Sequence, residues 1–459
     1  MGGPGLLVEI DPASKLPLHE QLERSLRADI RKGRLAAGAR LPSTRRLAAE
    51  LGISRGVVSE AYGQLAAEGY IETRQGAAAR VTRAVRGKND RTPARSLIST
   101  FRYDFRPCMP DLAGFPRDSW LRSVRAALRE SPIDAVGHSD SRGAPQLREA
   151  LTEYLARARG TASDPESTLI CSGFRQGFSL LCRWLRDQGI ESIAFEDPGW
   201  HGAHLIAEQQ GIQAIPIPVD ERGLRVDVLS ASQAQVVLTT PSHQFPTGAT
   251  LSRERRAALI EWAEQGERLI VEDDYDSELR YGGTAVGALQ GLAPERVLHI
   301  GSASQRLLPG LRLAWLLTPS WLAWPLISAK TIEDGGSEIV GQLALHDFIT
   351  RGELDRHIRR MRLRYSARRQ ILVTALAHSL PHAEPVGQAA GLFELVLLPH
   401  EINERRFLEA AAARGVGLEG LALHSYTPAG RPGIILGYGN LAEPSIQQAI
   451  NLMAEQIAG

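Results

Sequence analysis

Donors suited to a phosphate group gather in one segment of the second half of the chain. In GSASQRLLPGLR (301–312), the hydroxyl groups of Ser302 and Ser304 and the guanidinium of Arg312 lie within one loop. Hydroxyl and guanidinium groups donate hydrogen bonds to phosphate oxygens. The segment therefore predicts a phosphate site, with an ordinary serine-containing loop as the alternative.

Two further segments place polar groups where apolar runs end. VEDDYDSE (271–278) puts Asp273 at the end of RLIVED (268–273), and TPSHQFPTG (240–248) turns at Pro and Gly after QVVLTT (235–240). Parallel α/β sheets bind ligands at the carboxyl ends of their strands. Asp273 is therefore a candidate ligand contact, the alternative being that it only caps a neighbouring helix.

A second group of candidate binding residues lies near the N-terminus. Ser43 and Ser54 each precede a short helical pattern as an N-cap, and Gly52 supplies a left-handed turn between the two helices. Two short helices joined in this way form a helix-turn-helix, and the N-terminal end of the second helix enters the major groove of DNA. The residues placed toward DNA are Arg55, Gly56 and Ser59.

The elements around this motif complete a small domain. Leucine or isoleucine recurs every four residues from 18 to 30, which predicts an amphipathic helix that ends at Gly33. Segment 70–81 is short, β-like and glycine-containing, which predicts a hairpin wing. The apolar side of the second helix of the motif consists of Val58, Ala61, Tyr62 and Leu65.

The charge of the chain is unevenly distributed. The formal net charge of the 459 residues is only +1, which excludes a basic coat over the whole surface. Residues 1–83 carry 13 Lys and Arg against 9 Asp and Glu, and residues 84–99 are polar and lack hydrophobic periodicity. We therefore expect a DNA-binding domain at 1–83, a linker at 84–99, and an α/β domain with a mostly parallel sheet at 100–459.

Cysteine usage and hydropathy favour a cytoplasmic protein without a membrane segment. Cys108, Cys171 and Cys182 have no metal-type spacing and form no even disulfide set. No apolar run approaches the roughly 20 residues of a membrane helix, and the N-terminus lacks the basic and apolar regions of a signal peptide. No metal site is predicted.

The segment LPSTRRLAAELGISRGVVSEAYGQLAAEGYIETRQG (41–76) resembles the winged helix-turn-helix of GntR-type regulators over its full length. The resemblance implies DNA contacts from Arg45, Arg55 and the wing-tip residues Gln75 and Gly76. Arginine suits this role because its planar fork binds either two phosphate oxygens or a guanine edge. The wing continues as AAARV (77–81), where the family usually has a second glycine.

From about Tyr103 onward the chain resembles the fold-type I aminotransferases, specifically the MocR group, which fuses them to a GntR-type head. The motifs that carry the resemblance are RGAPQLREALTEYLARARG, EDPGWHGA, TPSHQFPTG, EDDYDSELRY and the RHIRRMR helix. It implies an α/β aminotransferase-like domain behind a winged helix-turn-helix, and a homodimer. The implied function is transcription regulation, with double-stranded operator DNA and a small-molecule effector as partners.

The resemblance also assigns roles around pyridoxal phosphate. Asp273 would pair with the pyridinium nitrogen, Tyr275 would reach the ring oxygen, and Trp200 would lie in the ring-stacking region. The phosphate would be held by Ser302, Ser304 and Arg312, with backbone amides near Gly173, Phe174 and Arg175.

One departure removes the central chemical group of that family. Gln305 stands where the family has the lysine that forms the Schiff base, and a carboxamide has no nucleophilic amine. After Lys88 the chain contains only one further lysine, Lys330, on a helical stretch where this family often has a lysine without a catalytic role. Pyridoxal phosphate is therefore expected to bind only noncovalently, if it is the ligand, and the protein is not expected to be an enzyme.

Three more positions depart from the family in the same region. Ala303 replaces an aromatic residue, His138 replaces a tyrosine that commonly touches the partner subunit's phosphate, and Ile435 replaces an arginine that grips carboxylates in amino-acid-binding members. We therefore interpret the chain as a DNA-binding regulator whose degenerate aminotransferase-like domain dimerises and senses an effector. The alternatives are a pyridoxal-phosphate enzyme with a DNA-binding head and a dimerising regulator without a small ligand.

Overall fold

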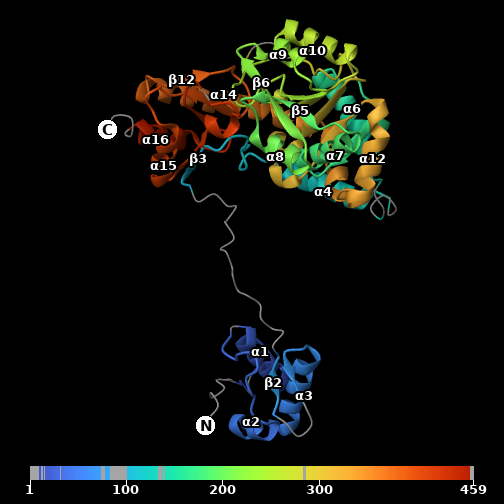
Figure 1. The fold of residues 1–459 in the computed structure, drawn as a ribbon, viewed down its shortest axis with the longest axis vertical. Coiled ribbons are helices and arrows are strands. Elements are labelled where there is room, and N and C mark those ends of the chain that lie inside the picture. Colours follow the sequence, from blue (N-terminus) through green and yellow to red (C-terminus); the bar gives the residue numbers. More distant parts are fainter. Residues whose placement is uncertain are drawn as a thin grey trace. The chain divides into compact units, whose positions relative to one another are not determined.

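The chain divides into two compact units, residues 1–97 and 98–459, each with a hydrophobic core of its own (Figure 1). In the part of the chain that is described, no helix is both long and apolar enough to cross a membrane. The structure is a computed structural model, and it describes residues 10–11, 14, 16–31, 33–73, 78–82, 101–132, 137, 140–282, 286–428 and 430–454.

The first unit is a three-helix domain with a small antiparallel hairpin. Its elements are α1 (Leu18–Arg31), α2 (Thr44–Leu51), α3 (Arg55–Ala67), β1 (Ile71–Glu72) and β2 (Arg80–Val81). Helices α1 and α3 pack against each other through a core that includes Leu22, Leu26, Ala61 and Leu65.

Local sequence signals fix the helix-turn-helix of this unit. The Ser43 side chain accepts a hydrogen bond from the Arg46 amide, and the Ser54 side chain accepts one from the Val57 amide, so both N-cap predictions are confirmed. Gly52 has a φ of +68°, the left-handed conformation that the turn requires. The predicted apolar side of α3 is buried at Val58, Ala61, Tyr62 and Leu65.

An eight-stranded sheet forms the centre of the second unit, in the order β4-β11-β10-β9-β8-β5-β6-β7. The five consecutive strands β10, β9, β8, β5 and β6 run parallel to one another. Strand β11 runs antiparallel to both of its neighbours, β10 and β4. The strands are β4 (Thr168–Cys171), β5 (Ser192–Asp197), β6 (Gln213–Asp220), β7 (Gly223–Leu224), β8 (Val236–Thr239), β9 (Leu269–Asp274), β10 (Val297–Ser302) and β11 (Ala314–Leu317).

Strand β11 begins three residues later than the apolar run LRLAWLL (311–317) indicates. The short 3-10 helix η4 (Pro309–Leu311) precedes it, and Arg312 then takes a left-handed conformation with a φ of +53°. A left-handed residue cannot join a β ladder, so pairing starts only at Ala314.

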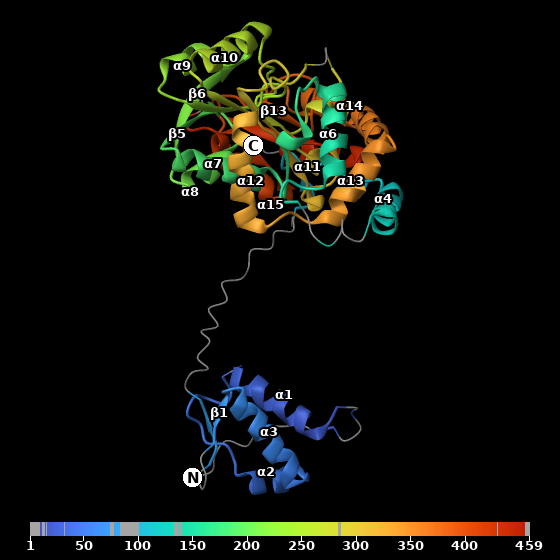
Figure 2. The ribbon, with the colours of Figure 1, turned by 90° about the vertical axis from the view of Figure 1, so that its right-hand side faces the viewer.

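Helices cover both faces of the sheet because residues alternate between faces along each strand. On β11, Ala314 and Leu316 belong to the core formed with α7, α8 and α12, whereas Trp315 and Leu317 belong to the core formed with α4, α6 and α13. Figure 2 shows these two groups of helices apart from each other. These helices are α4 (Arg117–Glu130), α6 (Pro145–Arg159), α7 (Phe174–Asp187), α8 (His201–Gln209), α12 (Ser320–Asp334) and α13 (Ile339–Thr350). Two further helices, α9 (Val226–Ala231) and α10 (Arg253–Gln265), share a core with β5, β6, β8 and β9.

The C-terminal part of the chain forms a smaller lobe beside the large sheet (Figure 1). The 27-residue helix α14 (Glu353–Ser379) leads into it and packs against α16. Strand β3 (Tyr103–Asp104) pairs with β14, so the start of the unit joins its end. The lobe contains β12 (Glu384–Val386), β13 (Phe393–Leu397), α15 (Glu404–Ala413), β14 (Val416–Gly417), β15 (Glu419–Gly420), β16 (Gly433–Gly437) and α16 (Glu443–Ala454).

Candidate functional site

A cavity of about 180 Å³ opens at the carboxyl ends of β9 and β10. We call it the Asp273 cavity. Residues far apart in the sequence come together around it, including nine that the sequence singled out: Phe174, Arg175, Trp200, Asp273, Tyr275, Ser302, Ser304, Gln305 and Arg312. The tenth, Gly173, is in direct contact with Arg312.

One end of the Asp273 cavity is built to receive an anion. Arg312 reaches the N-terminus of α7, where its guanidinium donates a hydrogen bond to the Ser172 carbonyl oxygen. Gly173 has a φ of +112°, and a Cβ at this position would lie 2.5 Å from the Arg312 Nη2 atom. No side chain caps the N-terminus of α7. The amides of Phe174 and Arg175 have no acceptor among the described residues. Together with the guanidinium and the hydroxyl groups of Ser302 and Ser304, they form a set of donors for an anionic group.

Backbone strain is concentrated at the same cavity. In the described ranges, the non-glycine residues with a positive φ are Cys108 (63°), Glu267 (52°) and Arg312 (53°). Two of these three line the Asp273 cavity. Strained backbone persists where the surrounding structure enforces it, and it is common at ligand sites.

Asp273 places a carboxylate in the cavity without a compensating partner. The Asp273 carboxylate forms no hydrogen bond or ion pair with any described residue. Burial, followed by the charges of Asp274 and Asp276, raises its pKa well above the usual range. A cationic group of a ligand would stabilise the charged form of this carboxylate.

Gln305 occupies the adjoining position on the short helix α11 (Ala303–Arg306). Its amide oxygen accepts a hydrogen bond from the Ser302 hydroxyl at 3.1 Å. Lys330 does not line the cavity. It is fully buried on α12, and its ammonium donates to Asp334 at 2.9 Å and to Ser337 at 3.0 Å.

Aromatic side chains form a wall of the cavity. The rings of Phe174 and Trp200 lie 5.4 Å apart in an edge contact, and the Arg175 guanidinium lies 5.1 Å from the Trp200 ring centre. The Tyr275 hydroxyl donates to the His243 carbonyl oxygen at 2.8 Å.

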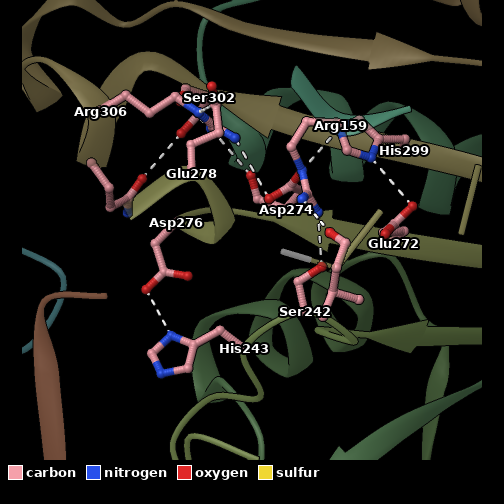
Figure 3. A network of polar contacts seen from close by, with 12 residues as sticks. Arg159, Ser242, His243, Glu272, Asp274, Asp276, Glu278, His299, Ser302 and Arg306 are labelled. Atoms are coloured by element: carbon pink, nitrogen blue, oxygen red, sulfur yellow. Dashed lines mark hydrogen bonds and ion pairs between the residues drawn. The ribbon is translucent and has the colours of Figure 1, made fainter. Parts of the chain in front are cut away.

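Beneath the cavity lies a buried ionic network, which we define by Arg159, Asp274, Glu278, His299 and Arg306 together with Glu272 (Figure 3). Arg159 donates to Asp274 at 2.8 Å and to the Ser242 hydroxyl at 2.8 Å. Burial alone would raise the pKa of Asp274, but Arg159 and Arg306 more than offset this and hold that pKa below its usual range.

Arg306 connects the ionic network to the segment that carries the anion donors. It is fully buried, it forms an ion pair with Glu278, and it donates to the Ser302 carbonyl oxygen at 2.7 Å. Glu278 in turn accepts a hydrogen bond from the Tyr154 hydroxyl. The network therefore fixes the backbone on which Ser302, Ser304 and Gln305 are placed.

Some lining residues were not singled out from the sequence. Thr240 and Phe245 lie in the segment TPSHQFPTG (240–248), and their position after a strand could have indicated a ligand contact. No local sequence feature indicates that Cys108 lines the cavity. Of the family departures, Ala303 and Ile435 are buried in apolar cores, and His138 lies outside the described residues.

The candidate DNA-binding residues of the first unit lie on its surface. Arg45, Arg55, Gly56 and Ser59 are all exposed, and Arg55 forms no ion pair with a described residue; its Nε atom lies 3.4 Å from the Thr44 hydroxyl. Arg46 instead pairs with Glu50 at 2.7 Å. Gln75 and Gly76 lie outside the described residues.

Comparison with known families assigns both units. Residues 18–81 match the model of bacterial regulatory proteins of the gntR family, and residues 113–420 match that of aminotransferase class I and II. Among solved structures, an archaeal alanine:glyoxylate aminotransferase is 26% identical with a TM-score of 0.71, covering 77% of this chain and 90% of its own. The multiple substrate aminotransferase of Thermococcus profundus is 26% identical with a TM-score of 0.72, covering 78% and 92%.

Similarity to curated proteins extends over both units together. The chain is 31% identical to the probable rhizopine catabolism regulatory protein MocR of Rhizobium meliloti, covering 97% of this chain and 94% of the relative. It is also 31% identical to the pyridoxine biosynthesis transcriptional regulator PdxR of Corynebacterium glutamicum, covering 99% of each. The chain therefore belongs to the MocR-type transcription regulators, in which a GntR-family helix-turn-helix domain precedes a domain of the aminotransferase class I and II fold.

Proposed function

We propose that this regulator senses a small anionic effector in the Asp273 cavity and binds it without a covalent bond. The observation that carries the proposal is the composition of the cavity. It keeps the Asp273 carboxylate, which pairs with no described residue, and anion donors around Arg312, but it has glutamine at position 305. Retained binding groups without a nucleophilic amine favour recognition over chemistry.

Pyridoxal phosphate fits the residues of the cavity in part. Its phosphate would be held by Ser302, Ser304, Arg312 and the α7 amides, and Asp273 would hold its ring nitrogen. When bound covalently to a lysine in an enzyme, this cofactor serves as an electron sink. Here Gln305 offers no amine, and Lys330 is committed to Asp334 and Ser337. We therefore propose reversible binding and no transamination.

The proposed DNA surface consists of the exposed face around the N-terminus of α3. Arg55 and Ser59 would read base edges, with Gly56 beside them facing the DNA, while Arg45 would hold a phosphate. Gln75 and Gly76 complete the surface by the family resemblance. The proposed assembly is a homodimer formed through residues 100–459, because a two-fold dimer reads paired half-sites. Light scattering on the fragment 100–459 should give a dimer; a monomeric fragment would contradict this part of the proposal.

One experiment tests the noncovalent mode of binding. The purified chain is mixed with pyridoxal phosphate, reduced with borohydride and weighed by mass spectrometry, and a parallel sample is dialysed and its absorbance recorded. We expect an unchanged protein mass and loss of the ligand on dialysis. A pyridoxyl group on Lys330 would overturn the proposal, because it would show that a lysine outside the cavity reaches the ligand.

The variant Gln305→Lys is the complementary arm of that experiment. Since the anion donors and Asp273 remain in place, we expect the variant to gain a borohydride-fixed adduct at position 305. Melting curves with and without ligand complete the test, because a ligand that binds only the folded state raises the melting temperature by mass action. If a ligand screen finds no compound that raises it, the domain only dimerises and effector sensing is wrong.

A further inference from the structure

A second, larger cavity borders the ionic network. It has a volume of about 560 Å³ and lies between the C-terminal end of α6, the short helix η3 (Ser277–Leu279) and the first half of α14. None of its lining residues lines the Asp273 cavity. We call it the arginine cavity after Arg157, Arg159, Arg280, Arg359 and Arg362, all of which line it.

Two of these five arginines are neutralised by carboxylates. Arg157 pairs with Asp355 at 2.9 Å, and Arg159 pairs with Asp274 at 2.8 Å. The other lining carboxylate, Glu278, is committed to the buried Arg306. The acidic groups of the cavity are therefore already matched.

The other three arginines have no ion-pair partner in the described part of the chain. Arg280 donates only to neutral groups, among them the Thr250 hydroxyl at 3.0 Å, and burial together with the nearby charge of Arg159 lowers its pKa. The Arg362 Nε atom donates a hydrogen bond to the backbone carbonyl oxygen of Glu278 at 2.6 Å. The Arg359 Nε atom donates one to the backbone carbonyl oxygen of Asp355 at 3.4 Å. The terminal nitrogens of Arg359 and Arg362 donate to no described residue.

Three uncompensated guanidinium groups at one hollow repel each other unless an anion lies between them. Their planar forks match the oxygens of phosphate and carboxylate groups. The volume lies within the roughly 300–1,000 Å³ range of small-molecule pockets, which is too small to admit a nucleic-acid duplex. We propose that the arginine cavity is a second binding site of this chain, for a small polyvalent anion with phosphate or carboxylate groups.

The position of the site connects it to the Asp273 cavity. An anion on Arg362 would pull on a side chain whose Nε holds the backbone oxygen of Glu278. The Glu278 carboxylate holds Arg306, which directly follows Gln305. Occupancy of the arginine cavity therefore acts on the segment that positions the first site.

The test uses inorganic pyrophosphate and, in a second arm, citrate, titrated calorimetrically into the full-length chain carrying Arg312→Ala. That substitution weakens anion binding in the Asp273 cavity, so the two sites are separated. We expect the added pair Arg359→Gln and Arg362→Gln to weaken binding of the preferred anion by at least about tenfold, as expected for loss of charged hydrogen bonds. The better-bound probe distinguishes a phosphorylated from a carboxylate ligand.

The control pair is Arg253→Gln and Arg360→Gln, which removes the same charge from exposed positions that do not line the cavity. It should leave binding unchanged. Ala158→Glu adds a negative charge to the cavity from an exposed position and keeps every arginine. It should therefore also weaken anion binding, which keeps the test valid even if the arginine pair impairs folding.

Four outcomes would overturn the proposal. One is no binding of either anion to the Arg312→Ala chain, and another is an equal loss in the control pair, which would indicate nonspecific charge. The third is a change from dimer to monomer in light scattering of the arginine pair, since the arginines would then serve a subunit interface. If the pair weakens operator binding in a gel shift but leaves pyrophosphate binding intact, the proposal also fails.

Discussion

Asp273 and Asp274 are neighbours on β9, yet they face opposite sides of the sheet. Successive side chains of a strand alternate, so Asp273 shares a face with Val271 and the α7 side, whereas Asp274 shares a face with Ile270. On its side Asp274 meets Arg159 and Arg306, and its pKa is lowered. Asp273, on the other face, lines the cavity, and the pKa of Asp273 is raised.

The difference between the two aspartates separates structural charges from binding charges. A buried charge that is paired and hydrogen-bonded belongs to the framework, because removing either partner leaves the other uncompensated. A carboxylate left without a partner costs stability unless a ligand compensates it. The same contrast recurs in the helix-turn-helix unit, where Arg46 is paired with Glu50 and Arg55 has no ion-pair partner among the described residues.

The largest effect on stability is expected from removing a cation that pairs with Asp274. Arg306→Met leaves Glu278 and Asp274 buried without their shared cation, which should lower the free energy of unfolding by about 3–5 kcal/mol. Urea unfolding followed by tryptophan fluorescence measures this in the second unit alone, since all seven tryptophans follow residue 100.

Arg312→Met is the matched control for Arg306→Met. Arg312 is exposed at the cavity and forms no ion pair with a described residue. Its replacement should change the urea midpoint far less. Equal losses in the two variants would contradict the distinction between paired and unpaired charges.

The second largest effect is expected on the affinity for operator DNA. Arg55→Ala should weaken operator binding by about 1–3 kcal/mol and relax sequence preference, as expected for loss of one base-reading arginine. Arg46→Ala breaks only a surface ion pair, worth about 0–1 kcal/mol, so it should affect operator and unrelated DNA alike and weakly. Gel shifts on both duplexes at one salt concentration provide the comparison. An Arg55→Ala chain with unchanged selectivity would remove Arg55 as a base reader.

Local features of the fold could be predicted from the sequence because local chemistry determines them. The N-caps at Ser43 and Ser54 and the left-handed Gly52 depend on contacts within a few residues. The strands at QVVLTT and RLIVED follow from short apolar runs, and the structure places them at β8 and β9. The start of β11 cannot be predicted from the run LRLAWLL (311–317), because the left-handed Arg312 interrupts it.

Long-range pairing could not be predicted. The partner of Asp274 is Arg159, which lies 115 positions earlier, and the register of β9 against β10 decides that His299 meets Glu272. The sequence identifies Asp273 as an acid at the end of a strand. It does not indicate that Asp274, one residue later, forms ion pairs. Cys108 joins the cavity only through the fold.

The smallest expected change is a gain in stability from Asp273→Asn. Because burial and nearby carboxylates raise the pKa of Asp273 in the folded chain, the folded state binds a proton that the unfolded chain has released above about pH 4. The stability that the acid contributes is therefore complete below its unfolded pKa and is lost as pH rises through the raised pKa. Asparagine has the same shape and no charge, so the variant should melt a few degrees higher than the parent at pH 8 and at nearly the same temperature at pH 4.

Asp274→Asn, at the adjacent residue, should change the melting temperature in the opposite direction. The pKa of Asp274 is lowered in the folded chain, so its contribution is present above its unfolded pKa and is lost as pH falls through the lowered value. The Asp274 variant should therefore melt below the parent at pH 8, with a difference that shrinks toward acid pH. Scanning calorimetry of both variants between pH 4 and pH 8 gives two curves that diverge in opposite directions. If Asp273→Asn is also destabilising at pH 8, Asp273 has a structural partner, and the cavity does not hold an uncompensated carboxylate for its ligand.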